Sequence, residues 1–501
     1  AGLTGGSAGD SGEGGGGDSG LGVGQGGAQD FGQFKEILEK GEIPGPETLD
    51  DVGFFNEHKI PLPTPACQQD VCLHGLYGEM GNMISGSNCI TVLVGMNTAI
   101  DISKLERPPL NLALVIDTSG SMQGEPIAYV KEGLLRMLDE LSSTDKISFV
   151  TFSDSARVQT EFVAGNDPAL IQAIDALSVG GSTNLYDGLR TGFELVAAHA
   201  DPATQNRVIF LSDGVATAGI TNDAKILAMG EGFSKQGLGL TTIGVGADFD
   251  VTLMRDLSEQ GSGAFYFLQD PAAVQEVFVE EVTSFLVPLA EDVQLTADIA
   301  DNYILRAIRG TKLATIDQNF GAVQIPNLQL AHRETVDDNT NGRRGGGGAI
   351  LLELLPRAGQ PRTESVGELK LRYRVPGTDT YVDQAAPIQT TLPPDQIDLE
   401  QGAFDDLSAE KGFVMLNIFV GFQMASTRAA QGDLLGALYL LDGLEGAVEG
   451  WLAAHPDFDI EDDLKYIRLF QDNLVTHGAN NDPNSPEWVP PPPPPEPWPE
   501  D

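Results

Sequence analysis

A carboxylate and two hydroxyls alternate in the segment Asp117-Thr118-Ser119-Gly120-Ser121, called here the DTSGS loop. The loop follows the apolar run 112–116, which is typical of a buried parallel strand, and precedes an amphipathic stretch, 127–141, that predicts a helix. Side chains two residues apart in extended chain project to the same side. We therefore expect Asp117, Ser119 and Ser121 to converge, and three hard oxygen donors suit a hard cation such as Mg²⁺ or Mn²⁺.

Two further segments carry oxygen donors directly after or before predicted elements. Thr183 lies in the glycine-bounded loop 180–184, just before a predicted helix, and Asp213 follows the apolar strand 208–211. Open α/β sheets bind ligands at the carboxyl ends of their strands. We expect Thr183 and Asp213 to lie at the same edge as the DTSGS loop.

With these residues in this order, the chain resembles the von Willebrand factor type A (VWA) family. The positions that match the metal-ion-dependent adhesion site of that family are Asp117, Ser119, Ser121, Thr183 and Asp213. The resemblance implies that the three hydroxyls ligate a divalent cation directly and that the two aspartates hold it mainly through water. It also implies an open coordination position that takes an Asp or Glu carboxylate of a protein partner. Mg²⁺ is the favoured ion, with Mn²⁺ or Ca²⁺ as alternatives.

Alternating strand and helix patterns position these donors. Strands are predicted at 112–116, 147–152, 208–211, 240–245 and 264–267, and helices at 127–141, 185–199, 224–235, 251–259 and 274–286. This alternation predicts a doubly wound, Rossmann-like parallel sheet.

The flanking sequence changes in period. Short alternating strands with turn signals follow residue 288 and predict an antiparallel β-sandwich, which we expect the strands before Pro108 to join. The VWA domain would then be inserted in the sandwich, and three amphipathic stretches after Phe404 predict a small helical bundle. The expected division is a Gly-rich flexible tail (1–28), N-terminal helices and strands that contribute to the sandwich (29–107), the VWA domain (108–287), the β-sandwich (288–400), the bundle (401–478) and a Pro-rich tail (479–501).

Composition limits the partners. The 501 residues carry 29 Lys and Arg against 73 Asp and Glu, a formal net charge of −44. Nucleic acids and anionic membranes need basic surface, so we expect neither as a partner. No apolar run reaches the length of a membrane span, so no transmembrane segment is expected.

The three cysteines, Cys67, Cys72 and Cys89, lie close together and lack the spacing of a metal site. Such clustering favours an exported protein with one local disulfide, either Cys67–Cys72 or a pairing that uses Cys89, and leaves one thiol over. Three reduced cytosolic thiols are the alternative. The glycine-rich start at Ala1 is typical of a processed amino terminus, and a lipid anchor upstream of it is an open alternative.

Segments around the DTSGS loop extend the resemblance. Phe31–Leu62 and the stretch 106–112 are similar to bacterial exported VWA proteins. The resemblance implies a location at the bacterial cell surface, in the periplasm or outside the cell.

No enzyme motif accompanies these features. The sequence lacks a phosphate-binding loop, an HExxH motif and a nucleophile elbow, and the calcium-like segment 337–342 has Gly348 where a bidentate Glu is needed. We therefore expect a non-enzymatic, metal-dependent adhesion module. A structural subunit of a self-assembling fibre or surface complex, with possible self-association, is the alternative. An accessory subunit of an enzyme complex is a weaker one.

Overall fold

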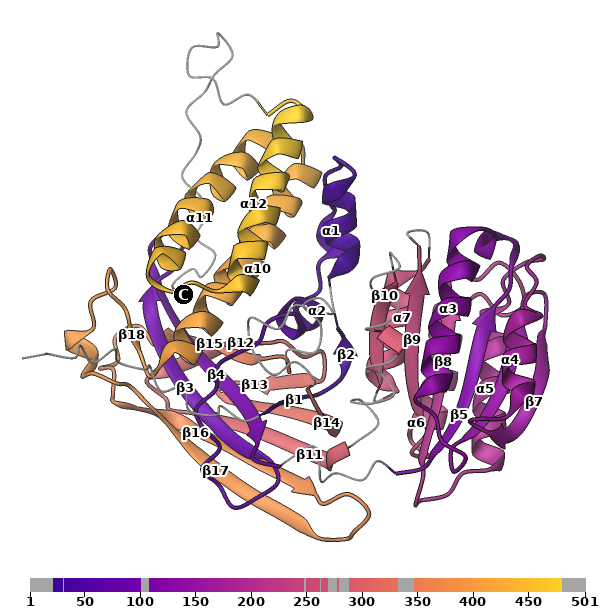
Figure 1. Ribbon diagram of the computed structural model, residues 1–501. Helices are drawn as coiled ribbons and strands as arrows, with labels where there is room; N and C mark the ends of the chain where they lie inside the picture. Colours follow the sequence, from indigo (N-terminus) through magenta and orange to yellow (C-terminus); the bar gives the residue numbers. More distant parts are fainter. Residues whose placement is uncertain are drawn as a thin grey trace, which may run out of the picture.

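The computed structural model describes residues 21–29, 31–100, 108–246, 249–261, 263–268, 277–278, 288–331 and 347–479. Figure 1 shows two bodies, an α/β domain and a larger body built from antiparallel strands and long helices. Most of the predicted helix 274–286, the calcium-like segment and both extreme tails lie outside the described residues.

The α/β domain contains a seven-stranded sheet with the order β2-β10-β9-β8-β5-β6-β7. Its main strands are parallel, and β7, which the sequence did not predict, runs antiparallel to β6. The strands are β5 (Leu110–Asp117), β6 (Lys146–Phe152), β7 (Ala156–Ala164), β8 (Gln205–Ser212), β9 (Gly239–Val245) and β10 (Ala264–Leu268). The helices are α3 (Glu125–Asp139), α4 (Pro168–Asp175), α5 (Leu185–Ala198), α6 (Asp223–Ser234) and α7 (Val251–Gln260).

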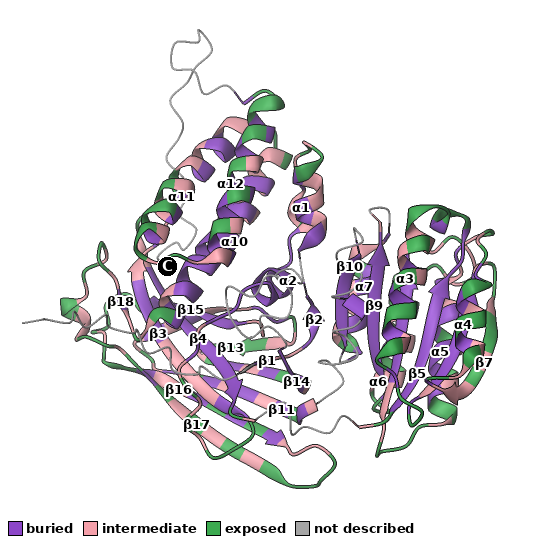
Figure 2. Ribbon diagram, viewed as in Figure 1, coloured by how far each residue is buried: buried purple, intermediate pink, exposed green. Residues whose placement is uncertain are grey.

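Helices cover both faces of this sheet. Alternate residues of β5 enter two separate cores: Leu114 packs with Leu134 of α3, and Val115 packs with Phe193 of α5. Both faces of the central strands are therefore buried (Figure 2). Burial on both faces explains why the sequence shows a continuous apolar run at β5 rather than an alternating one.

The second sheet has eleven strands, and all of its pairings are antiparallel. β4 precedes the α/β domain and pairs with β15, which follows it, in a register that sets Val92 opposite Leu352. The α/β domain is thus inserted between strands of this sheet. The strands are β1 (Leu21–Gly24), β3 (Cys72–Gly81), β4 (Asn88–Thr98), β11 (Pro288–Ile299), β12 (Tyr303–Arg309), β13 (Ala314–Asp317), β14 (Phe320–Leu330), β15 (Ile350–Pro356), β16 (Ser365–Arg374), β17 (Tyr381–Gln389) and β18 (Ala403–Phe404).

The glycine-rich segment 21–28 corrects one expectation. It was predicted to be part of a flexible tail, but β1 pairs with both β4 and β14, and β2 (Gly27–Ala28) adds a parallel strand to the α/β sheet beside β10. Gly26 connects β1 and β2 with φ = +78°, and a side chain there would approach the carbonyl oxygen of Gly263 to 2.7 Å. Glycine here permits a tight turn between two sheets rather than disorder.

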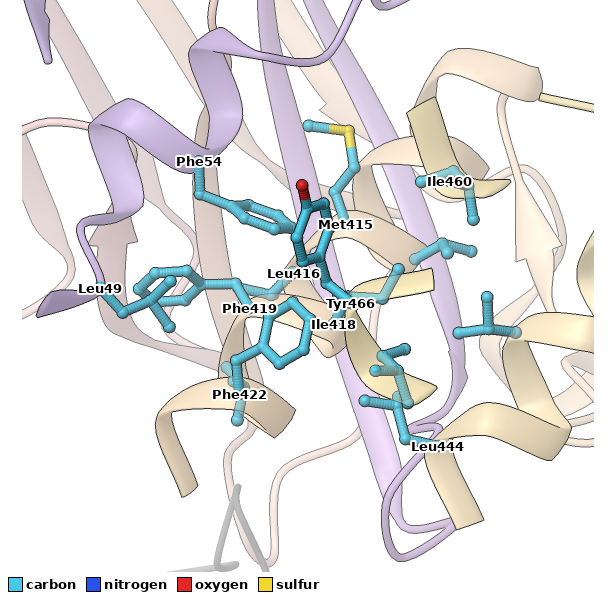
Figure 3. Packing of buried hydrophobic residues seen from close by; sticks show 14 of the residues in the cluster. Leu49, Phe54, Met415, Leu416, Ile418, Phe419, Phe422, Leu444, Ile460 and Tyr466 are labelled. Carbon is cyan, nitrogen blue, oxygen red and sulfur yellow. The ribbon is translucent and has the colours of Figure 1, made fainter. Parts of the chain in front are cut away.

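Five helices pack on the antiparallel sheet and on one another: α1 (Gly32–Glu39), α2 (Asp51–Asn56), α10 (Leu407–Ala430), α11 (Leu434–Ala454) and α12 (Phe458–Thr476). Asp50 caps α2 by accepting from Gly53 N at 3.0 Å. Figure 3 shows Phe54 packed against Phe419 and Phe422 of α10. No helix within the described ranges is both long enough and apolar enough to cross a membrane.

Buried charges join the α/β domain to the rest of the chain. Asp50 of the α2 cap lies 3.2 Å from Arg255 Nη1 of α7 and 3.1 Å from Lys312 Nζ, which follows β12. Asp51 also pairs with Lys312 and accepts from Gly310 N at 2.9 Å. This group of side chains, together with β2, fastens the α/β domain at its β10 edge.

Candidate metal site

The DTSGS loop starts where β5 ends, at Asp117. A short 3-10 turn, η3 (Gly120–Met122), follows, and Gly124 (φ = +100°) leads into α3. The side chain of Met122 is fully buried and anchors the turn in the core. The loop is therefore held at both ends by the strand and helix that the sequence predicted.

Three of the expected donors form one hydrogen-bonded row. Ser119 Oγ lies 3.0 Å from Ser121 Oγ, and Ser121 Oγ donates to Asp213 Oδ1 at 2.8 Å. Ser119 and Asp213 are 1% and 6% exposed, whereas Ser121 is exposed. The accessible hydroxyl of Ser121 therefore lies between two buried side chains.

Thr183 joins this row from a third loop. A Cβ built on Gly214 would lie 3.5 Å from Thr183 Oγ1 and 3.6 Å from Ser121 Oγ, so the two hydroxyls flank Gly214. Two hydrogen bonds join Thr183 to Thr217. Thr183 N donates to Thr217 Oγ1 at 2.9 Å, and Thr217 N donates to Thr183 O at 2.9 Å. Thr217 was not predicted as part of the site, because nothing in the local sequence pattern marks it.

Asp117 lies beneath the row and is fully buried. Its Oδ1 accepts from Ser119 N at 2.8 Å, and its Oδ2 accepts from Ser212 Oγ at 2.6 Å. Burial raises the pKa of Asp117, and the hydrogen bonds from Ser212 and Ser119 partly oppose that rise. No ion pair of the described residues includes Asp117, so its charge is compensated by dipoles alone. Ser212 was also missed, although its place at the end of β8 was the available signal.

Backbone hydrogen bonds lock two of these loops together. Gly180 N donates to Thr118 O at 2.8 Å, and Gly120 N donates to Gly181 O at 3.2 Å. Both Gly180 and Gly181 have positive φ values, which a residue with a Cβ adopts only with strain. The glycines that bounded the loop in the sequence thus allow its close approach to the DTSGS loop.

The structure therefore brings all five predicted residues to one edge of the sheet. The donor set fits a hard divalent cation, because it combines neutral hydroxyls with carboxylates and contains no sulfur or imidazole. Within the described ranges no group of three or more His, Cys, Asp or Glu side chains suits a metal.

The predicted cysteine sites are also placed. Cys67 and Cys72 form a disulfide, and Cys89 lies outside it on β4, 1% exposed. Burial of Cys89 disfavours an intermolecular disulfide through its thiol.

Comparisons with known proteins agree with the fold. Residues 111–280 match the family model of the von Willebrand factor type A domain. The uncharacterized protein sll0103 of Synechocystis sp. is 25% identical over 342 residues, which cover 67% of this chain and 77% of that protein. The inter-alpha-trypsin inhibitor heavy chain H1 of Mesocricetus auratus is 30% identical over 197 residues, but these are only 37% of this chain and 21% of the heavy chain.

A solved structure extends the likeness beyond the α/β domain. The von Willebrand factor type A protein from Catenulispora acidiphila superposes with a TM-score of 0.51 at 14% identity, covering 76% of this chain and 88% of that one. At this identity the likeness concerns the fold alone. The chain thus contains a VWA domain, together with an antiparallel sheet and helices.

Proposed function

We propose that this chain is a non-enzymatic binding protein that presents a divalent cation, Mg²⁺ in the first place, to an acidic residue of a protein partner. Ser119, Ser121 and Thr183 would bind the ion directly, and Asp117 and Asp213 would hold its water ligands. The observation that carries the proposal is the convergence of these five side chains around a buried carboxylate without an ion pair.

The chemistry of the donors explains the preference for an acidic partner. Three neutral hydroxyls leave the 2+ charge of the ion largely unquenched, so the ion dominates the local field. A carboxylate from outside is the strongest oxygen ligand that a protein partner can offer at the open position. A strongly acidic protein can thereby bind an acidic group at one focused point despite its net charge of −44.

The position of the site supports presentation to a partner. The site lies at the carboxyl ends of the parallel VWA strands. The amino ends of these strands face the body that contains the antiparallel sheet (Figure 1). A cleft at those amino ends is lined by Gln205 and Gly239 on the VWA side and by Glu291 and Arg374 on the sheet side. In our proposal the antiparallel strands form a sandwich and the three long helices form a bundle. Together they hold the sheet edge that carries the metal site away from the cell surface.

The proposed location is the exterior or envelope of a bacterial cell. The Cys67–Cys72 disulfide supports an oxidising compartment. The heavy chain relative is named as one chain of a larger inhibitor, which supports binding to another protein rather than catalysis.

Metal titration of the full chain tests the proposal. We expect Mn²⁺ or Mg²⁺ to bind with one-to-one stoichiometry by calorimetry, and Asp117→Ala to abolish that binding. The exposed Asp175→Ala is the matched control and should bind as the parent does. Partner proteins captured from envelope extracts should be lost on chelation and on Asp117→Ala. Capture that survives both treatments, or a parent chain that binds no divalent ion, would refute the proposal.

One observation favours a second candidate, a self-associating subunit. β1 fills the space between β4 and β14, but it makes only two residue pairs with each, and half of the residues 21–28 are glycine. Exchange of such an N-terminal strand between identical chains is a low-cost route to assembly. Gly22→Cys with Asn97→Cys, which lie opposite each other in the register, distinguishes the cases. Cross-linked monomers alone, at high protein concentration, would count against assembly.

A further inference from the structure

Asp154, in the turn between β6 and β7, touches a loop that carries a proposed metal ligand. The side chain is exposed, and its Oδ1 accepts from Ser182 N at 2.9 Å and also from Ser182 Oγ. The backbone of the same turn contributes as well. Ser153 O accepts from Asn184 N at 2.9 Å, and Asp154 O accepts from Asn184 Nδ2 at 3.1 Å. The turn is therefore hydrogen-bonded to both neighbours of Thr183, Ser182 and Asn184.

These hydrogen bonds matter because the loop contains two consecutive glycines. Gly180 and Gly181, with φ values of +154° and +93°, are intrinsically free to adopt many conformations, and here only backbone hydrogen bonds to the DTSGS loop restrain them within the described residues. After Ser182, Thr217 holds the backbone of Thr183 from the opposite side. Thr183 thus lies between two side-chain anchors: Thr217 holds its own backbone, and Asp154 holds Ser182, the residue that follows the glycines.

A charged acceptor strengthens the anchor. Hydrogen bonds from Ser182, first from its side chain and then from its backbone, hold the pKa of Asp154 below its ordinary value. Two donors on one carboxylate oxygen form charge-assisted hydrogen bonds, which are stronger than neutral ones. A Cβ on Gly181 would approach the Asp154 carboxylate to 3.1 Å, and the φ of +93° at Gly181 also favours glycine at that position.

We propose that Asp154 is a positioning residue of the metal site, which fixes the Ser182 backbone so that the Thr183 hydroxyl points at the ion. It lies outside the five-residue motif and on a different loop from each motif residue. The inference rests on the proposed function, because it assumes that Thr183 is a ligand. Partners of metal ligands commonly change metal affinity by about 10- to 100-fold when they are removed.

Three variants of the full chain separate positioning from charge. Asp154→Ala removes the anchor, Asp154→Asn keeps an acceptor oxygen but removes the charge, and Ser182→Ala removes one donor while leaving Asp154 intact. The matched control is Asp175→Asn, an exposed aspartate of the same domain at the end of α4. Circular dichroism confirms that each variant is folded.

Two measurements read the effect: the Mn²⁺ dissociation constant by calorimetry, and amide hydrogen exchange at residues 182–184 in the metal-free protein. We expect Asp154→Ala to weaken Mn²⁺ binding about tenfold and to speed exchange at these amides, while Asp154→Asn recovers most of both. The control should change neither.

The outcomes distinguish the two proposals. Wild-type affinity in Asp154→Ala, with normal binding in the parent, overturns the positioning role and leaves the proposed function standing. Weakened binding in both Asp154 variants without faster exchange would show a charge effect only, which also overturns positioning. A parent chain that binds no Mn²⁺ removes the proposed function itself.

Discussion

Two buried aspartates of this molecule are compensated in different ways. Asp50, 5% exposed, is paired with Arg255 and Lys312, which come from two separate parts of the chain. Among the described residues, Asp117, fully buried, has hydrogen bonds from Ser119 N and Ser212 Oγ and no ion pair. Burying a carboxylate without a cation is costly. Basic side chains thus neutralise Asp50 where the two bodies meet. The carboxylate of Asp117 has no basic partner among the described residues, and this is where we propose that an ion binds.

The surroundings of the two sites explain the difference. Asp50 lies where α7, α2 and the residues after β12 meet, so long basic side chains reach it from both bodies. Asp117 lies against short hydroxyl side chains and backbone amides, with Ser119 N and Ser212 Oγ as its hydrogen-bond donors. A site for an external cation is thus recognisable as a buried negative charge among small polar residues.

Breaking the paired site should have the largest effect on stability. Arg255→Met keeps much of the apolar contact but leaves Asp50 with Lys312 alone, and we expect the free energy of unfolding to fall by about 3 kcal/mol. Urea unfolding of the full chain measures it. Arg190→Met is the control, because Arg190 pairs with Asp187 and Glu194 on the surface. It should cost less than about 1 kcal/mol. Equal losses in both variants would remove the contrast between buried and exposed pairs.

The same junction should depend on pH through Glu259 of α7. Burial, and then the nearby Asp50, raise the pKa of Glu259 to about 8, with Asp256 acting in the same direction and Lys312 and Arg255 opposing. The folded chain therefore binds a proton that the unfolded chain releases above its ordinary pKa of 4.5. The contribution of Glu259 to stability is lost as pH rises from about 4.5 to about 8.

Glu259→Gln should accordingly raise the free energy of unfolding at pH 9 by on the order of 2 kcal/mol. The gain should vanish near pH 4, where the native side chain is protonated in both states. Thermal unfolding of parent and variant across this range is the measurement. A gain that is the same at both pH values would show that packing, not ionisation, is responsible.

The smallest change is expected at the metal site and has the opposite sign from Arg255→Met. Asp117→Asn keeps the size of the side chain and removes an uncompensated buried charge, so the metal-free chain should gain about 1 kcal/mol. The same variant should lose Mn²⁺ affinity by about 100-fold or more. Stability in EDTA and calorimetry with Mn²⁺ measure the two effects. Loss of stability in EDTA would indicate that Asp117 is compensated within the chain after all.

Much of the α/β domain was predictable, because its signals are local. Each of the five predicted strands contains residues that form a strand, and Ser119 and Ser121 follow β5 as their spacing indicated. β7 was missed because none of its residues is buried and it lacks an apolar run. β3 was missed because glycines interrupt its pattern, and the structure uses Gly75 to make room for Leu369.

The supports of the site were less predictable than its ligands. Ser212, Thr217 and Asp154 are single polar residues whose roles depend on loops that meet only after folding. The same holds for the segment 21–28, whose glycines indicated a flexible tether. In the structure the small size of these glycines, and the positive φ values of Gly26 and Gly27, allow one segment to join two sheets.

The sequence by itself determined which residues can donate oxygen to an ion and that these residues follow strand ends. It could do so because side-chain spacing and strand periodicity are properties of neighbouring residues. Only the tertiary structure decided that Asp50 is paired and Asp117 is not, and that Asp154 holds the loop of Thr183. Those outcomes depend on contacts between distant segments, where burial and charge act between groups that no local pattern relates.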